Sequence, residues 1–302
     1  MTDKSVDLYV YGLDRFKRFD TGSRPTYITA DKEGLLWVAT ESNGLFSINK
    51  ETMESRNFYF NPSDPFSISS NNFSVDQYNP IVVDPMGNLW VGTLNGLNYY
   101  QKERDVFQRL QSSESNPNTI SSNRINTLLI KGNHLYVGTP KGLDRMNIGD
   151  FSSITRFAGS LWFSPLNQYS VNQIIDYGEK AVTPGLWIAT TTGMVFYDET
   201  LDMFGDLDWD YLFGQFVKNI YNDSDGNLWI DVLAFTGLIH FQTDNFFKMG
   251  GMFQESDFQI LQPNSEGALA VVKAVSYTHL RAHETPEHRV SGGVGGKKKR
   301  GG

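Results

Sequence analysis

One sequence pattern recurs five times along the chain, and this repetition limits the fold more than any other feature. The copies begin at Ile28, Ile81, Ile125, Val171 and Val217. Each copy carries an aromatic anchor at the same place, and the anchors are Trp37, Trp90, Tyr136, Trp187 and Trp229. They are 42 to 53 residues apart. A period of this length is typical of an array built from one small structural unit.

The first half of each copy predicts two strands joined by a turn. A continuous apolar stretch comes first, which is typical of a strand buried on both faces. An Asp-x-x-Gly turn follows, with Asp84 and Gly87 or Asp223 and Gly226 at its ends. Asp accepts hydrogen bonds from the backbone just after it, and Gly adopts the positive φ that such turns need. The second strand contains the aromatic anchor and ends at a threonine, for example Thr93 or Thr139.

The second half of each copy predicts two further strands. The turn before the third strand contains Gly44, Gly96, Gly142 or Gly193, and in two copies the glycine follows Asn. Asn-Gly is a strong hairpin signal. The fourth strand is marked by a phenylalanine in every copy, at Phe58, Phe107, Phe157, Phe204 and Phe247. Four antiparallel strands per 42 to 53 residues predict the blade of an all-β propeller. No repeat shows the 3.6-residue apolar period of a helical solenoid.

The repeat boundaries predict about five complete blades and a stub. The propeller is expected over residues 1–273. Its blades lie near residues 28–60, 81–110, 125–158, 171–205 and 217–248, with the stub at 258–271.

The composition changes abruptly at residue 274. Residues 274–302 hold three of the five histidines and end in a run of Gly and Lys. This stretch resembles translated read-through of a sequencing adapter, so we expect a non-native, disordered tail whose deletion leaves the melting temperature unchanged. The tail has a net charge of +4, which leaves −12 on the first 273 residues. A body this acidic is a poor partner for nucleic acid.

Other global features exclude several classes of protein. The chain has no cysteine, so disulfides and thiolate chemistry are absent. It has no apolar run of the length that crosses a membrane, so this segment is expected to make no membrane contact. The residues after Met1 do not have the pattern of a signal peptide.

The residues from Asp84 to Leu97 read Asp-x-x-Gly-Asn-Leu-Trp-Val-Gly-Thr-x-x-Gly-Leu and resemble the two-component regulator propeller repeat. The connectors at residues 67–71 and 119–123, which contain Ile-Ser-Ser-Asn, are similar to the segment between blades in that family. The resemblance covers residues 27–271. The sequence departs from the family pattern at Asp231, where the family has Gly, and in the loop at residues 232–237.

The resemblance implies an extracytoplasmic, periplasmic sensor region of a hybrid histidine-kinase regulator. It also implies an oligosaccharide ligand, the remainder of the receptor chain as a partner, and a possible homodimer of the full receptor. The family forms seven-bladed rings, so this chain is expected to form an open, incomplete ring. The blade of Trp37 and the stub would then leave apolar faces unpaired. The alternative is a smaller ring that the segment from Leu8 to Phe19 closes.

Four residues are candidates for ligand contact. Asp208, Trp209 and Asp210 place carboxylates beside an aromatic ring, and Trp162 lies outside the repeat register. The same carboxylates could form a glycosidase pair, but an exposed blade edge or loop with outward charges is the better explanation of them. The repeated tryptophans are expected to pack between blades because they recur in every copy.

No catalytic motif, cofactor site or metal site is predicted. Residues 222–227 resemble part of a calcium loop but lack the further oxygen ligands that calcium needs. The predicted function is therefore a non-enzymatic sensor module that binds carbohydrate. Two alternatives stay open: a protein-interaction propeller of the WD-repeat type, and a propeller lyase or glycosidase.

Overall fold

A computed structural model gives the fold of the chain. It describes residues 4–10, 12, 14–157, 170–178, 185–206, 215–223, 225–233 and 238–241, and the backbone of 258–263 and 269–274. Every regular element over these residues is a β-strand. No helix among them is long and apolar enough to span a membrane.

The strands form a two-stranded hairpin followed by five sheets. The hairpin consists of β1 (Ser5–Val10) and β2 (Arg15–Asp20). The sheets are called blades 1 to 5 in chain order. Blade 1 comprises β3 (Pro25–Ala30), β4 (Leu35–Thr40), β5 (Leu45–Asn49) and β6 (Ser55–Phe58), and blade 2 comprises β7 (Ile81–Val83), β8 (Leu89–Thr93), β9 (Gly96–Gln101) and β10 (Val106–Leu110). Blade 3 comprises β11 (Thr127–Lys131), β12 (His134–Thr139), β13 (Gly142–Asn147) and β14 (Asp150–Arg156), and blade 4 comprises β15 (Val171–Asp176), β16 (Gly185–Thr190), β17 (Gly193–Asp198) and β18 (Met203–Asp206). Blade 5 comprises β19 (Val217–Asn222), β20 (Leu228–Val232), β21 (Leu238–Phe241), β22 (Phe258–Pro263) and β23 (Leu269–Ala274).

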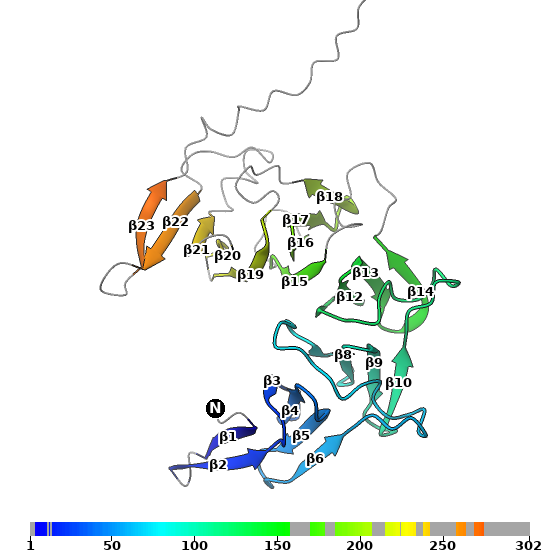
Figure 1. The fold of residues 1–302 in the computed structure, drawn as a ribbon. Helices are drawn as coiled ribbons and strands as arrows, with labels where there is room; N and C mark the ends of the chain where they lie inside the picture. The colour runs from blue at the N-terminus through cyan, green and yellow to red at the C-terminus, as the bar shows by residue number, and fades with distance from the viewer. Residues whose placement is uncertain are drawn as a thin grey trace, which may run out of the picture.

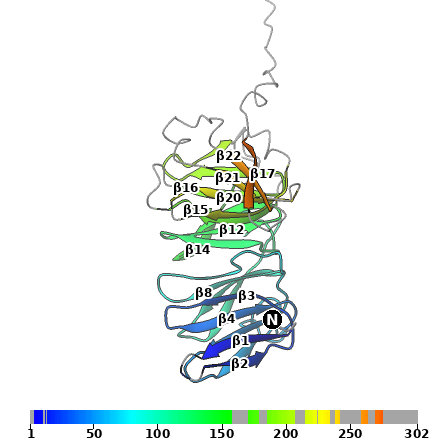
Figure 2. The same cartoon turned by 90° about the vertical axis from the view of Figure 1, so that its left-hand side faces the viewer.

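Within each blade the strands pair in chain order, and every pairing is antiparallel. The first strands of successive blades contact one another, so they line the inner side of the array. Figure 1 shows the blades side by side along an arc, with β1 and β23 at its two ends. Turned by 90°, the blades lie one above another from the hairpin upward (Figure 2). The structure therefore confirms an all-β, open array of four-stranded propeller blades.

The turn between the first two strands is built as its sequence predicts. Asp31 Oδ1 accepts hydrogen bonds from the backbone N–H groups of Glu33 and Leu35, and Gly34 has φ +81°. Asp31 Oδ2 accepts a hydrogen bond from Trp37 Nε1 at 3.2 Å. The anchor and the turn thus hold each other in place. The corresponding Trp90 Nε1 is buried without a partner.

A threonine closes the second turn in four blades. Its hydroxyl donates to the carbonyl oxygen of the glycine that starts the third strand, at 2.8 to 3.1 Å. The same hydroxyl oxygen accepts a backbone N–H within the turn. The threonines are Thr40, Thr93, Thr139 and Thr190, all of them buried. Each threonine therefore satisfies the polar groups of a turn that packs inside the array.

The apolar core consists of layers between neighbouring blades. The anchors Trp37, Trp90, Tyr136 and Trp187 are essentially inaccessible to solvent. Trp37, for example, packs edge-to-face on Tyr100 of blade 2, with ring centroids 5.5 Å apart. Each layer joins only two consecutive blades, so burial depends on the presence of the neighbour.

Both ends of the array differ from expectation. The stub predicted at residues 258–271 does not begin a sixth blade, because β22 pairs with β21 and β23 pairs with β22. The N-terminal residues do not close a ring. They form the β1–β2 hairpin, and Phe19 of this hairpin packs on Val38 and Phe46 of blade 1. Blade 1 is therefore covered on the side that was expected to be bare.

Two turn glycines test the backbone geometry. Gly44 has φ +77°, and a Cβ added there would lie 2.3 Å from the carbonyl oxygen of Phe58. Gly87 has φ +88°, but a Cβ there would meet nothing within 4 Å. We predict that Gly87→Ala lowers the free energy of unfolding by about 1–2 kcal/mol through the positive φ alone. Gly44→Ala should lower it by a further 1–3 kcal/mol or so through the clash. Urea unfolding measures the free energy of unfolding of both variants. An equal decrease in the two variants would contradict the predicted effect of the clash at Gly44.

Asp144 is a buried carboxyl group in a position where blade 2 has an amide. Asn98 accepts a hydrogen bond from Ser69 N and donates through Nδ2 to the carbonyl oxygens of Val91 and Gly96. Asp144 Oδ2 accepts a hydrogen bond from Ser121 N at 2.7 Å, but its Oδ1 is buried without a partner. Burial raises the pKa of Asp144 to about 6, although both hydrogen bonds from Ser121 oppose this shift.

The raised pKa predicts a pH-dependent stability. Because the folded state binds the Asp144 proton more tightly than the unfolded state, its contribution is complete below about pH 4. It is lost as the pH rises through about 6, by about 3 kcal/mol at most. We therefore predict that Asp144→Asn stabilises the protein at pH 7–8 and flattens stability between pH 4 and 7.

Asn98→Asp is the mirror variant and should introduce the same pH dependence in blade 2. Thermal unfolding across this pH range checks both variants. Identical pH profiles for wild type and Asp144→Asn would contradict the assignment.

Candidate functional site

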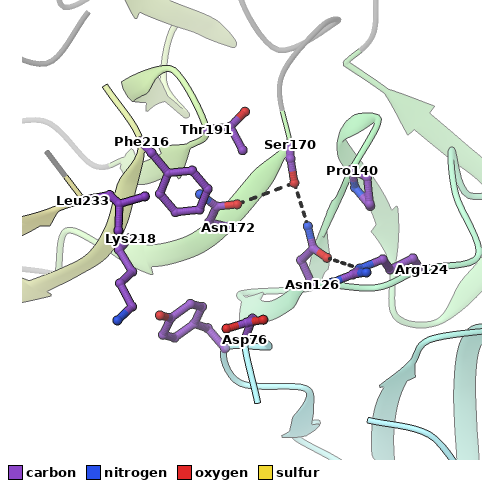
Figure 3. Close-up of a pocket in the computed structure, with 11 residues that line it drawn as sticks. Asp76, Arg124, Asn126, Pro140, Ser170, Asn172, Thr191, Phe216, Lys218 and Leu233 are labelled. Atoms are coloured by element: carbon purple, nitrogen blue, oxygen red, sulfur yellow. Dashed lines mark hydrogen bonds between the residues drawn. The ribbon is translucent and has the colours of Figure 1, made fainter. Parts of the chain in front are cut away.

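A cavity of about 580 Å³ opens on the inner side of the arc. Blades 3, 4 and 5 and the segment before β7 contribute its walls. The lining residues are Asp76, Tyr78, Arg124, Asn126, Pro140, Ser170, Asn172, Thr191, Phe216, Lys218 and Leu233. Most of them lie where a first strand begins or just after a second strand ends, so one end of the blades forms the site (Figure 3).

The repeat explains why these side chains gather there. Ile125, Val171 and Val217 occupy one repeat position and are fully buried. The residues on either side of them line the cavity, because side chains alternate along an extended strand. The preceding residues are Arg124, Ser170 and Phe216, and the following residues are Asn126, Asn172 and Lys218. The buried positions keep their residue type from copy to copy. The lining position before them differs in all three copies, and the one after them is Asn in two copies and Lys in the third.

A chain of hydrogen bonds crosses the floor of the cavity. Asn126 Nδ2 donates to Ser170 Oγ and to the Val171 carbonyl oxygen, both at 2.9 Å. Asn172 Nδ2 donates to the Val217 carbonyl oxygen at 3.0 Å. We call Asn126, Ser170 and Asn172 the polar floor; Figure 3 shows the three side chains in a row between the two walls. The polar floor bonds blade 3 to blade 4 and blade 4 to blade 5, which positions its amide and hydroxyl groups.

Tyr78 lies at the edge of the cavity and connects distant parts of the chain. Its backbone N–H donates to the Asn126 carbonyl oxygen, and its side chain lies near Asn219 and Asp231 of blade 5, which both affect the pKa of its hydroxyl. Asn219 in turn donates to Asp231 Oδ2 at 2.9 Å. Burial, with smaller effects from Asp231 and Asp76, raises the pKa of the Tyr78 hydroxyl above its usual value. The hydroxyl is therefore protonated at neutral pH and can donate a hydrogen bond.

The two walls of the cavity have different chemistry. On one side Phe216 and Leu233 of blade 5 are 37% and 69% exposed and line the cavity together, so they give this wall an apolar surface. Lys218 extends from the same blade, and Arg124 lies on the opposite side (Figure 3). An apolar surface beside amides, hydroxyls and cations can bind a ligand that is partly apolar and rich in oxygen atoms.

The ligand-contact residues predicted from the sequence are not among these. Trp162, Asp208, Trp209 and Asp210 lie outside the described residues. The anchors Trp37, Trp90 and Trp187 are buried in the layers between blades, while Trp229 is held by Asp223. The cavity residues were missed because they lack any motif. Their signal is the variation of residue type at fixed repeat positions.

The described residues contain no cluster of three or more potential metal ligands. In the segment that resembles a calcium loop, both carboxylate oxygens of Asp223 accept hydrogen bonds within the turn. His240, on β21, stacks on Trp229 with ring centroids 4.5 Å apart. None of the described residues that line the cavity is a histidine.

Comparison with known families and structures places the chain among propeller proteins. The two component regulator propeller family matches residues 211–231, a stretch that includes the Asp223 turn and the anchor Trp229. This match confirms the resemblance that the repeats indicate. No protein of curated function matches the sequence.

Solved structures share the fold at low sequence identity. One is the extracellular domain of a putative hybrid two component system from B. thetaiotaomicron, with 19% identity and a TM-score of 0.64. The match covers 91% of this chain and 34% of that domain. A second such domain from the same organism has 18% identity, a TM-score of 0.50 and coverages of 90% and 36%. This chain therefore spans about a third of the length of each.

A propeller enzyme has the same fold. It is the catalytically inactive H270A variant of virginiamycin B lyase from Staphylococcus aureus, with 11% identity and a TM-score of 0.57. The match covers 88% of this chain and 79% of the lyase. At these identities the likeness establishes the propeller fold and leaves the function to be argued from the site.

Proposed function

We propose that the chain is part of the ligand-sensing region of a two-component receptor and that its inner cavity binds a short oligosaccharide. The observation that carries this proposal is the polar floor of Asn126, Ser170 and Asn172 beside the exposed ring of Phe216. Saccharides present hydroxyl groups around their edges and C–H groups on their faces. The amides and hydroxyls can bond the former, and an aromatic ring can stack on the latter.

The cations fit the same kind of ligand. Arg124 and Lys218 face the cavity in a chain whose first 273 residues carry −12. Both side chains can donate to hydroxyl or carboxylate oxygens. Neutral and acidic oligosaccharides are therefore both candidates, and their relative affinity measures what the cations contribute.

The receptor context rests on the family match. The two component regulator propeller repeat and the likeness to extracellular domains of hybrid two component systems support an extracytoplasmic, periplasmic location. In this proposal the partner of the propeller is the remainder of the receptor chain, and the full receptor forms a homodimer. Nucleic acid and membrane have no part in it.

A non-enzymatic role is the better reading of the cavity. Propeller lyases share the fold, but an acid–base pair would have to converge on bound substrate. Among the described residues that line the cavity, Asp76 is the one carboxylate and none is a histidine. Binding without turnover is therefore expected. Measurable turnover of an oligosaccharide would favour the lyase or glycosidase alternative.

The predicted result of removing the stacking ring is a loss of affinity. Phe216→Ala should weaken binding of a cognate oligosaccharide by roughly tenfold, because the apolar surface that the ring buries against the sugar contributes on the order of 1–2 kcal/mol. Isothermal titration calorimetry against a panel of neutral and acidic oligosaccharides measures this loss.

Phe66→Ala is the matched control, because Phe66 is an exposed phenylalanine on the outer side of blades 1 and 2, away from the cavity. It should bind as the wild type does. Equal losses in both variants, or a loss in Phe66→Ala alone, would show that the ligand binds elsewhere. A panel in which no saccharide binds, together with capture of a protein, would favour the protein-interaction alternative.

A further inference from the structure

The N-terminal hairpin corresponds to the outer half of a blade. In β1 and β2, Asp7 pairs with Arg18. The third and fourth strands of blade 2 pair Asn98 with Arg109 in the same register, and those of blade 3 pair Asp144 with Arg156. The three hairpins therefore carry an acid or amide opposite an arginine at one equivalent position.

The packing of the hairpin follows the same correspondence. Val6 and Leu8 flank Asp7 and pack into the core shared with blade 1. Leu97 and Tyr99 flank Asn98 and pack into the core shared with blade 3. The hairpin thus occupies the place of a blade that precedes blade 1. It packs on blade 1 with the same face that blade 2 packs on blade 3.

The inner half of this blade is missing from the described residues. β9 lies between β8 and β10, and β13 lies between β12 and β14. Over the described part of the chain, β1 pairs with β2 alone. Its other edge is a row of backbone groups of the kind that binds an added strand.

The paired Asp7 and Arg18 indicate which hydrogen-bonding groups the inner half of the blade would supply. In blade 2, Asn98 Oδ1 accepts a hydrogen bond from Ser69 N at 2.8 Å, and Arg109 Nε donates to the Ser67 carbonyl oxygen at 2.7 Å. Both serines belong to the Ile-Ser-Ser-Asn connector that precedes the first strand. The two groups together hold this connector.

Blade 3 repeats the arrangement with its own connector. Asp144 accepts a hydrogen bond from Ser121 N, and Arg156 Nε donates to the Thr119 carbonyl oxygen, both at 2.7 Å. In the hairpin the equivalent groups bond each other: Arg18 Nε donates to Asp7 Oδ1 at 2.8 Å, and the Arg18 side chain is 60% exposed.

A second surface of the hairpin supports the same conclusion. Phe107 of blade 2 is 3% exposed, because Phe58 of the blade before it packs edge-to-face on its ring at 5.7 Å. Phe16 occupies the equivalent position in the hairpin and is 68% exposed. An aromatic side chain of this repeat is therefore presented where another blade would cover it.

We propose that the β1–β2 hairpin is the outer half of a split blade and binds two inner strands of the same repeat type, preceded by a Ser-Ser connector. The partner is defined by its chemistry. A serine supplies a backbone N–H and a hydroxyl to Asp7, connector carbonyl oxygens accept from Arg18, and a strand adds along the edge of β1 that faces away from β2.

The test uses a peptide copied from the chain itself. Residues 112–141 contain the connector and the two inner strands of blade 3. Added to the full chain, this peptide should bind with a 1:1 stoichiometry and protect the backbone amides of β1 from hydrogen exchange. Asp7→Ala should weaken binding by roughly tenfold, as expected for a lost hydrogen bond to a charged group. Asp7→Asn should retain it, since Asn98 does the same in blade 2. Glu103→Ala, an exposed acid remote from β1, is the control.

A fusion protein provides a second test that does not depend on the solubility of the free peptide. The same 112–141 copy, joined directly before Ser5, should raise the melting temperature by several degrees and protect β1, and Ser121→Ala in the copy should reduce both effects. Unprotected β1 amides in the fusion would overturn the proposal. So would sedimentation showing that β1 pairs with a second copy of the chain and that the peptide fails to separate the two.

Discussion

The structure depends on the burial of one blade face against the next. An isolated four-stranded sheet with both faces apolar would expose Trp37, Trp90 and their equivalents to water. The layers between blades remove these faces from solvent, and the turn contacts of Asp31 and the threonine clasps such as Thr40 position the second strand for this packing. Close approach also needs small side chains. A Cβ at Gly138 would lie 2.4 Å from Thr127 and 2.6 Å from Val171, so glycine there lets blades 3 and 4 meet.

The same constraint explains how a rigid array can carry a variable site. Ile125, Val171 and Val217 are fixed in the layers between blades, and the residues beside them are free to differ because they point into the cavity. The polar floor then joins consecutive blades with hydrogen bonds whose donors and acceptors also face the cavity. A ligand in the cavity would contact residues of three blades whose positions depend on one another.

Much of this fold could be predicted from the sequence because the repeats carry their own turn chemistry. Gly87 and Gly226 have the positive φ that their turns predict, and the strands of blades 1 to 4 lie near their predicted places. In blade 5 the strand that pairs with β21 is β22, whereas the predicted marker Phe247 lies outside the described residues. The ends of the array were not predictable in the same way. The β1–β2 hairpin lacks the anchor and the Asp-x-x-Gly turn, so its correspondence to an outer half-blade becomes visible only in the structure, through strand pairing and packing such as that of Asp7 with Arg18. The cavity was missed for a related reason: Phe216 and Lys218 are defined by register and by no motif.

Neighbouring blades determine only the local angle between two sheets, and small errors in such angles would accumulate along five of them. Tyr78 acts differently. Its backbone N–H bonds to Asn126 of the segment that enters blade 3, and its side chain lies near Asn219 and Asp231 of blade 5. This contact is a chord across the arc. It relates two blades that are not consecutive and thereby limits the curvature of the arc between blades 3 and 5. Because Tyr78 also lines the cavity, a bound ligand and the curvature of this part of the arc would depend on each other.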